Sequence, residues 1–108
     1  MKGRGHIKPA DYASKLEQQY AAILELRKRS GDIHDYWYEP FSLRLGEKTF
    51  YRPDFLVQLP DGLLELHETK GYWHDDARVK WKVAADKYPC FVFVAIQYIK
   101  RQWVEERL

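Results

Sequence analysis

Two carboxylates and one ammonium group lie close together near the middle of this chain of 108 residues. Asp54 opens one apolar run, and Glu68-Thr69-Lys70 closes the next one. Two carboxylates can bind a hard divalent cation such as Mg²⁺, and an ammonium group beside them can hold a phosphate or the attacking water. These residue types therefore predict a metal-dependent phosphodiesterase.

The segment between the two runs indicates how these side chains would meet. Pro60 and Asp61 have the types expected at the centre of a tight turn, and Gly62 follows them. We therefore expect residues 51–59 and 63–70 to pair as a hairpin. Glu68 and Lys70 are two residues apart on a strand and would project from the same face. In the right register, Asp54 lies across from that pair.

The flanking segments predict an α+β fold. Residues 12–29 and 75–88 carry apolar side chains at helical offsets, residues 33–45 alternate as a first strand, and residues 90–96 form a nearly unbroken apolar run. Such a run is typical of a strand that is covered on both faces. The expected order is α-β-β-β-α-β, with a mixed central sheet flanked by helices.

Size and composition fit one domain over residues 1–108. An apolar content of 45% is enough for one core, whereas a net charge of +2 is too small to identify a nucleic-acid binder. We expect a flexible basic arm at residues 1–9 and a basic and aromatic tail at residues 97–108, with Ile99 and Trp103 one helical turn apart.

A single cysteine, Cys90, lies in the last apolar run and has no partner for an intramolecular disulfide. No apolar segment is long enough to span a membrane or to form the core of a signal peptide. These features predict a cytoplasmic protein that does not contact membranes.

The order of elements, together with Pro53-Asp54 and Glu68-Thr69-Lys70, resembles the PD-(D/E)XK nuclease superfamily. Within it, the chain looks most like small phage and prophage endonucleases of the phage T7 endonuclease I type, which resolve Holliday junctions. Further segments that carry the likeness are residues 14–17, 31–41 and 51–55. The resemblance implies a restriction-endonuclease-like core and a Mg²⁺-dependent DNA endonuclease in which Mn²⁺ can substitute. It also implies a role in phage DNA processing or branched-DNA resolution, in a bacterial host cell, and a homodimer.

The resemblance also assigns roles to individual residues. Asp54 and Glu68 would bind the metal, helped by the backbone carbonyl of Thr69, and Lys70 would position the nucleophile or stabilise the transition state. Glu17 would contribute to the metal site from the first helix. A capping or surface glutamate is the alternative for Glu17. Glu39 ranks below Glu17 as a further acidic candidate.

A second group of residues suggests contacts to DNA. Arg78, Lys80 and Lys82 would form a basic helix face that holds phosphates, and Tyr72 or Trp73 would stack on an exposed base. An ordinary solvated helix face explains the same charges.

A zinc site is the competing metal hypothesis, with His67, His74 and Cys90 as ligands. Their spacing fits no structural zinc pattern, so we do not favour it. Because successive side chains of a strand point to opposite faces, we expect His67 on the face opposite Glu68, where it would pack or make a polar contact.

Two other classes of function stay open at this stage. One is a nucleic-acid-binding or assembly module that has the same fold without catalysis, and the other is a structural component of a larger phage assembly. The substrate is open as well, because a four-way junction, a flap, a single strand and a plain duplex all present the same phosphodiester.

Overall fold

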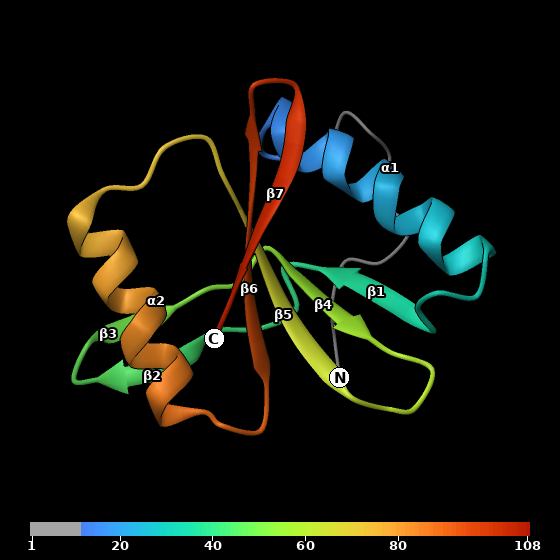
Figure 1. Cartoon of the computed structure of the whole chain (residues 1–108). Helices are drawn as coiled ribbons and strands as arrows, with labels where there is room; N and C mark the ends of the chain where they lie inside the picture. The colour runs from blue at the N-terminus through green and yellow to red at the C-terminus, as the bar shows by residue number, and fades with distance from the viewer. Residues whose placement is uncertain (1–11) are drawn as a thin grey trace.

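The fold is that of a computed structural model in which residues 12–108 are described, so the expected basic arm at residues 1–9 lies outside the described residues. In chain order the elements are α1 (Lys15–Arg29), β1 (Asp35–Tyr38), β2 (Leu43–Gly46), β3 (Thr49–Tyr51), β4 (Phe55–Gln58), β5 (Leu64–Lys70), α2 (Asp75–Lys87), β6 (Val92–Ile99) and β7 (Gln102–Arg107). A five-stranded sheet has the order β1-β4-β5-β6-β7, and β2 and β3 form a separate hairpin (Figure 1). This confirms the predicted α+β class.

The hairpin of β4 and β5 forms as its turn residues predict. The Gly62 N–H donates to the Leu59 carbonyl at 2.9 Å, which closes a turn with Pro60 and Asp61 at its centre. Gly62 has a φ of 93°, a conformation that glycine adopts without strain. The strands pair antiparallel with Phe55 opposite His67, so the register brings Asp54 next to Glu68.

Strand β6 lies parallel to β5, and α2 makes the crossover between them. Its central side chains are buried on both faces, with Phe93 and Ala95 on one face and Val94 and Ile96 on the other. The prediction of a strand covered on both faces is confirmed. Cys90 lies ahead of the strand and is exposed, so its expected place in the buried run is wrong.

The single strand expected over residues 33–45 is wrong, because the structure divides it into β1 and β2, which belong to different sheets. The break falls at Glu39 and Pro40. Glu39 has a φ of 45°, and Pro40 has no N–H with which to continue a strand ladder. The chain therefore leaves the main sheet here and returns to it only at β4.

The tail expected at residues 97–108 is also wrong. β6 runs on to Ile99 and turns through Lys100 and Arg101, which have φ values of 52° and 64°, into strand β7. Tyr98 pairs with Trp103 across this hairpin. The helical spacing of Ile99 and Trp103 was misleading, because the two residues lie on paired strands.

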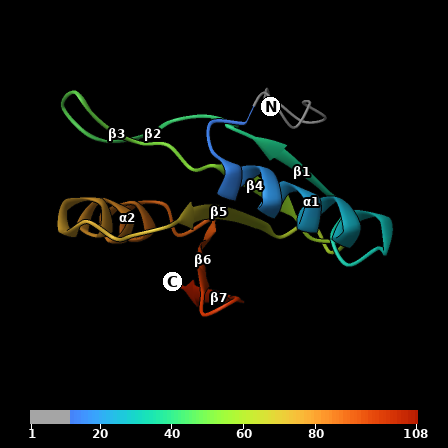
Figure 2. The ribbon, with the colours of Figure 1, turned by 90° about the horizontal axis from the view of Figure 1, so that it is seen from above.

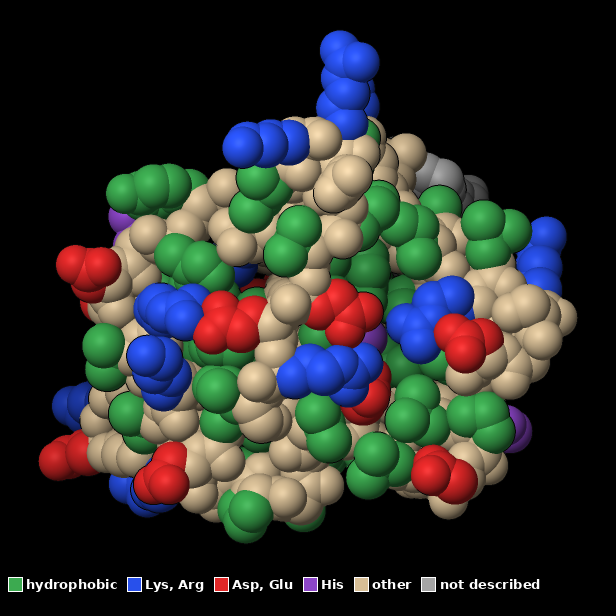
Figure 3. Space-filling view, in the orientation of Figure 1, with side chains coloured by type: hydrophobic (Ala, Val, Ile, Leu, Met, Phe, Trp, Pro, Cys, Tyr) green, Lys and Arg blue, Asp and Glu red, His purple; other side chains and the backbone are tan. Residues whose placement is uncertain are grey.

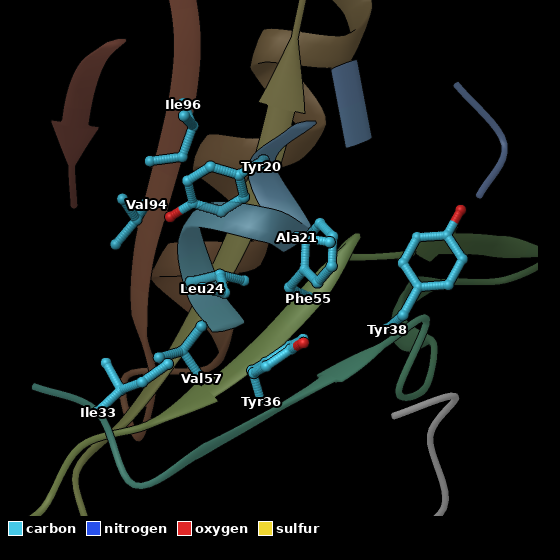
Figure 4. Close-up of a cluster of buried hydrophobic side chains, with 10 residues drawn as sticks. All are labelled: Tyr20, Ala21, Leu24, Ile33, Tyr36, Tyr38, Phe55, Val57, Val94 and Ile96. Carbon is cyan, nitrogen blue, oxygen red and sulfur yellow. The ribbon is translucent and has the colours of Figure 1, made fainter. Parts of the chain in front are cut away.

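The helices cover opposite faces of the sheet (Figure 2). Helix α1 buries Tyr20, Ala21 and Leu24 against side chains of β1, β4 and β6, as Figure 4 shows. Helix α2 buries Trp81 and Ala84 against the other face, where the hairpin of β2 and β3 completes the cover. Neither helix in the described residues is long and apolar enough to cross a bilayer.

A buried polar chain links α1 to β5 on the first of these faces. The Tyr20 hydroxyl lies 2.5 Å from His67 Nδ1, and His67 Nε2 lies 2.7 Å from Glu65 Oε1. Burial lowers the pKa of His67, so the ring is neutral and accepts from Tyr20 while it donates to Glu65. Burial opposes ionisation of Glu65, but the hydrogen bonds from His67 and Arg107 outweigh it and lower its pKa to about 2. His67 is therefore a satisfied core residue.

Removing the hydroxyl in Tyr20→Phe is expected to lower the free energy of unfolding by about 1–2 kcal/mol, because it leaves His67 Nδ1 buried without a donor. Tyr36→Phe is the matched control. Its hydroxyl donates to the partly exposed Glu25, so the loss there should be about 0.5 kcal/mol. Urea unfolding of both variants measures the difference, and equal losses would contradict the buried link.

Candidate active site

The predicted catalytic residues meet at one hollow of about 480 Å³. It lies where the first turn of α1, the segment ahead of β4 and the carboxyl end of β5 come together. Its lining residues are Ser14, Leu16, Glu17, Arg52, Asp54, Glu68, Thr69, Lys70 and Gly71. Segments far apart in the sequence therefore supply three carboxylates and one ammonium group to the same space.

Asp54 is held in place by hydrogen bonds directly ahead of β4. Its Oδ2 accepts hydrogen bonds from the Thr69 N–H at 2.8 Å and from the Thr69 hydroxyl at 3.1 Å. Its own carbonyl accepts from the Glu39 N–H at 2.7 Å. The two bonds from Thr69 tie Asp54 to the strand that carries Glu68, as the predicted hairpin register requires.

Glu68 and Lys70 project from one face of β5, as their spacing predicts. Lys70 Nζ lies 3.2 Å from Glu68 Oε2, and the Glu68 side chain is almost fully buried. The Lys70 ammonium also lies 5.3 Å from the centre of the Trp73 ring. Both contacts limit where the ammonium can go, so it stays at the edge of the hollow.

Glu17 faces the hollow and is only 7% exposed, which excludes the surface alternative. Ser14 caps α1 by accepting from the Glu17 N–H at 3.1 Å. The Glu17 carboxylate accepts from the Tyr38 hydroxyl at 3.3 Å and lies within hydrogen-bonding reach of Asp54. Glu17 thus contributes its backbone to the cap and its side chain to the site.

The three carboxylates repel one another in a partly dry environment. The pKa of Asp54 is raised to about 8, first because the carboxyl is buried and then because the charges of Glu17 and Glu68 lie close by. Burial also raises the pKa of Glu68, against the opposing effect of the Lys70 ammonium. A bound cation would relieve this repulsion and favour the charged forms.

The donor set fits Mg²⁺ better than zinc. The acidic side chains of the hollow offer carboxylate oxygens, which hard cations prefer. No three His, Cys, Asp or Glu side chains within residues 12–108 are arranged to hold one ion. Mg²⁺ needs only one or two carboxylates because it keeps several of its waters. Asp54 and Glu68 can supply these, and Glu17 can hydrogen-bond to the waters.

No family model, curated protein or solved structure matches this chain. The chemistry of the hollow is therefore what supports a function.

The basic face predicted on α2 is divided in the structure. Arg78 forms two hydrogen bonds to the Glu106 carboxylate of β7, at 2.9 and 2.6 Å, and Lys82 lies near the same carboxylate. Lys80, on the other flank of the helix, lines a second hollow together with Glu68 and Lys70. Arg78, Lys80 and Lys82 therefore do not form one basic surface.

The surface that carries β7 has no single sign of charge. Figure 3 shows acidic and basic side chains interleaved across this face. Arg78 pairs there with Glu106, and Arg107 pairs with Glu65 and Glu105. Such a face holds little net attraction for a polyanion.

The two aromatic residues after β5 differ in exposure. The Tyr72 side chain is 72% exposed, so it is available to stack on a base. Trp73 packs on Trp81, with ring centres 5.3 Å apart, and Arg78 lies over both rings. Trp73 thus supports the loop between β5 and α2, and its predicted stacking on DNA stays a prediction.

Two tyrosines near the carboxylates were not predicted as site residues. Tyr38 bonds to Glu17, and the buried hydroxyl of Tyr51 lies beside Glu68 without a hydrogen-bond partner among residues 12–108. Burial of the ring and, after it, the charge of Glu68 raise the pKa of Tyr51. The aromatic cluster around Tyr38 was visible in the sequence, but only the fold shows which ring points at the site.

Proposed function

We propose that this chain is a metal-dependent endonuclease that hydrolyses phosphodiester bonds in DNA. The observation that carries the proposal is the meeting of Asp54, Glu68, Lys70 and Glu17 at one hollow, with the pKa of both strand carboxylates raised. Burying several carboxylates together costs stability, which a site for a cation would explain. Phage DNA processing or resolution of branched DNA in the bacterial cytoplasm is the setting we infer.

Asp54 and Glu68 would hold the cation, together with the backbone carbonyl of Thr69. Mg²⁺, or Mn²⁺ in its place, supplies charge neutralisation at the scissile phosphate and acidifies a bound water when it is present. The Thr69 N–H and hydroxyl keep one Asp54 oxygen fixed, so the carboxylate does not have to be ordered when a cation arrives. Glu17 accepts a hydrogen bond from the attacking water and orients it.

Lys70 would act on the reacting phosphate. As water attacks phosphorus, the bond to the leaving oxygen breaks and negative charge builds up on the phosphate oxygens. The Lys70 ammonium, held at the rim by Glu68 and Trp73, stabilises that charge. Hydrolysis then leaves one phosphate end and one hydroxyl end, with no covalent enzyme intermediate.

Calorimetric titration with Mn²⁺ tests the metal centre apart from turnover. We expect the wild-type protein to bind Mn²⁺ and Glu68→Gln to bind it at least about tenfold more weakly, because one of the two anionic ligands is lost. Glu105→Gln, an exposed glutamate on β7, is the control and should bind as the wild type does. Absence of binding by the wild type would instead favour a nucleic-acid-binding or assembly module without catalysis.

A further inference from the structure

A second hollow of about 410 Å³ adjoins the candidate active site. It lies between the hairpin of β2 and β3 and helix α2, and it shares Arg52, Glu68 and Lys70 with the first hollow. Phe50, Tyr51, Ala77 and Lys80 complete its lining. The two hollows therefore meet at Arg52, Glu68 and Lys70.

Two cations in this second hollow have no partner among residues 12–108. Neither Arg52 nor Lys80 makes an ion pair or a hydrogen bond there. Other basic side chains of the fold are engaged, for example Arg78 with Glu106 and Lys28 with Asp35. Two unpaired cations in one hollow favour the binding of an anion, because their fields add in a space with partly apolar walls.

The position of these cations identifies the anion. A chain of phosphates that presents one group to Asp54, Glu68 and Lys70 must continue beyond them. Among the described residues, Arg52 and Lys80 are the only other charged side chains that line the adjoining hollow. Phe50, which is 43% exposed, adds an apolar surface for a sugar or a base. A free metabolite would not need a binding site that adjoins the catalytic groups.

We propose that the second hollow binds the nucleotide next to the scissile phosphate, with Arg52 and Lys80 on its phosphate group. This inference rests on the proposed nuclease function and deepens it. The subsite holds the strand in register, so that the neighbouring phosphodiester reaches the carboxylates. Arg52, which directly precedes Pro53-Asp54, links phosphate binding to the placement of the catalytic carboxylate.

Affinity for a fluorescent DNA oligonucleotide, measured over a series of salt concentrations, tests the subsite without cleavage. The parent is Asp54→Asn, which keeps the fold and removes a catalytic carboxylate. Arg52→Gln and Lys80→Gln in this parent should each weaken binding roughly three- to tenfold and reduce the slope of log affinity against log salt by about 0.7–0.9. Lys82→Gln is the matched control, since Lys82 is exposed on the opposite flank of the same helix beside Glu106.

Each outcome decides the proposal. The subsite is supported if both test variants bind DNA more weakly and with a smaller salt slope while the control is unchanged. The proposal is overturned if Arg52→Gln and Lys80→Gln keep the salt slope of the parent, if Lys82→Gln weakens binding equally, or if the parent does not bind. Cleavage of plasmid DNA by the wild-type protein, scored separately, shows whether the proposed function stands when the subsite fails.

Discussion

Replacing Lys70 by alanine is expected to reduce metal-dependent cleavage of DNA by about 10²- to 10³-fold. Among residues 12–108, Lys70 is the one side chain that forms an ion pair with Glu68, and removing a charge-stabilising group from a pre-organised site typically costs this much. Single-turnover rates on an end-labelled oligonucleotide with Mg²⁺ measure the effect. Because Lys70 lies at the rim and is 25% exposed, its truncation should change stability by less than about 1 kcal/mol.

Two comparisons make the Lys70 result specific. Lys82→Ala removes a cation from exposed α2 and should cleave at the wild-type rate. Lys70→Arg keeps the charge with a different shape and should recover part of the activity, since a point charge and a planar guanidinium are not equivalent. A Lys70→Ala protein that folds normally and cleaves at the wild-type rate would remove Lys70 from the mechanism.

The second large effect concerns stability, and its sign is unusual for an active-site change. In the metal-free protein, Asp54→Asn is expected to raise the free energy of unfolding at pH 9 by about 1–3 kcal/mol. The folded pKa of Asp54 is raised to about 8, so the native state prefers the protonated carboxyl. The stability due to protonation is complete below the ordinary carboxyl pKa and is lost as the pH rises through about 8. Asparagine imitates the protonated form at every pH.

Urea unfolding of both proteins at pH 5 and pH 9 tests this prediction. The variant should be the more stable at pH 9, and its advantage over the wild type should be much smaller at pH 5. Mg²⁺ at pH 9 should stabilise the wild type and leave Asp54→Asn nearly unchanged, because only the wild type has both ligand carboxylates. A variant that is less stable than the wild type at pH 9 would show that the carboxylates do not repel one another.

Much of the site was predictable because it depends on local rules. The turn at Pro60 and Asp61 sets the register of β4 and β5, and that register alone brings Asp54 to Glu68. Glu68 and Lys70 lie on the same face of β5 because side chains alternate between the two faces of a strand. Glu17 was predictable in part, since its helix flank was clear but its contact with Tyr38 and Asp54 depends on how α1 docks on the sheet.

The parts that sequence reasoning missed depend on tertiary contacts. Residues 33–45 have the composition of one strand, yet the chain breaks at Glu39 and Pro40 because the second half covers the far face of the sheet. The final strand was hidden because Ile99 and Trp103 have a helical spacing by chance. The charges of α2 look alike in sequence, but Glu106 of β7 lies near Arg78 and Lys82, whereas Lys80 has no ion-pair partner in the described part of the chain.

Cleavage of supercoiled plasmid DNA by the purified wild-type protein, with Mg²⁺ and with EDTA, tests the central claim most directly. A preparation of Asp54→Asn made in the same way controls for a contaminating nuclease. We predict that the wild type nicks or linearises the plasmid with Mg²⁺, that EDTA stops the reaction, and that Asp54→Asn shows at least about 10³-fold less product. Equal cleavage by both preparations, turnover in EDTA, or no cleavage by a folded wild-type protein on plasmid and junction substrates alike would contradict the assignment of these carboxylates to a nuclease centre.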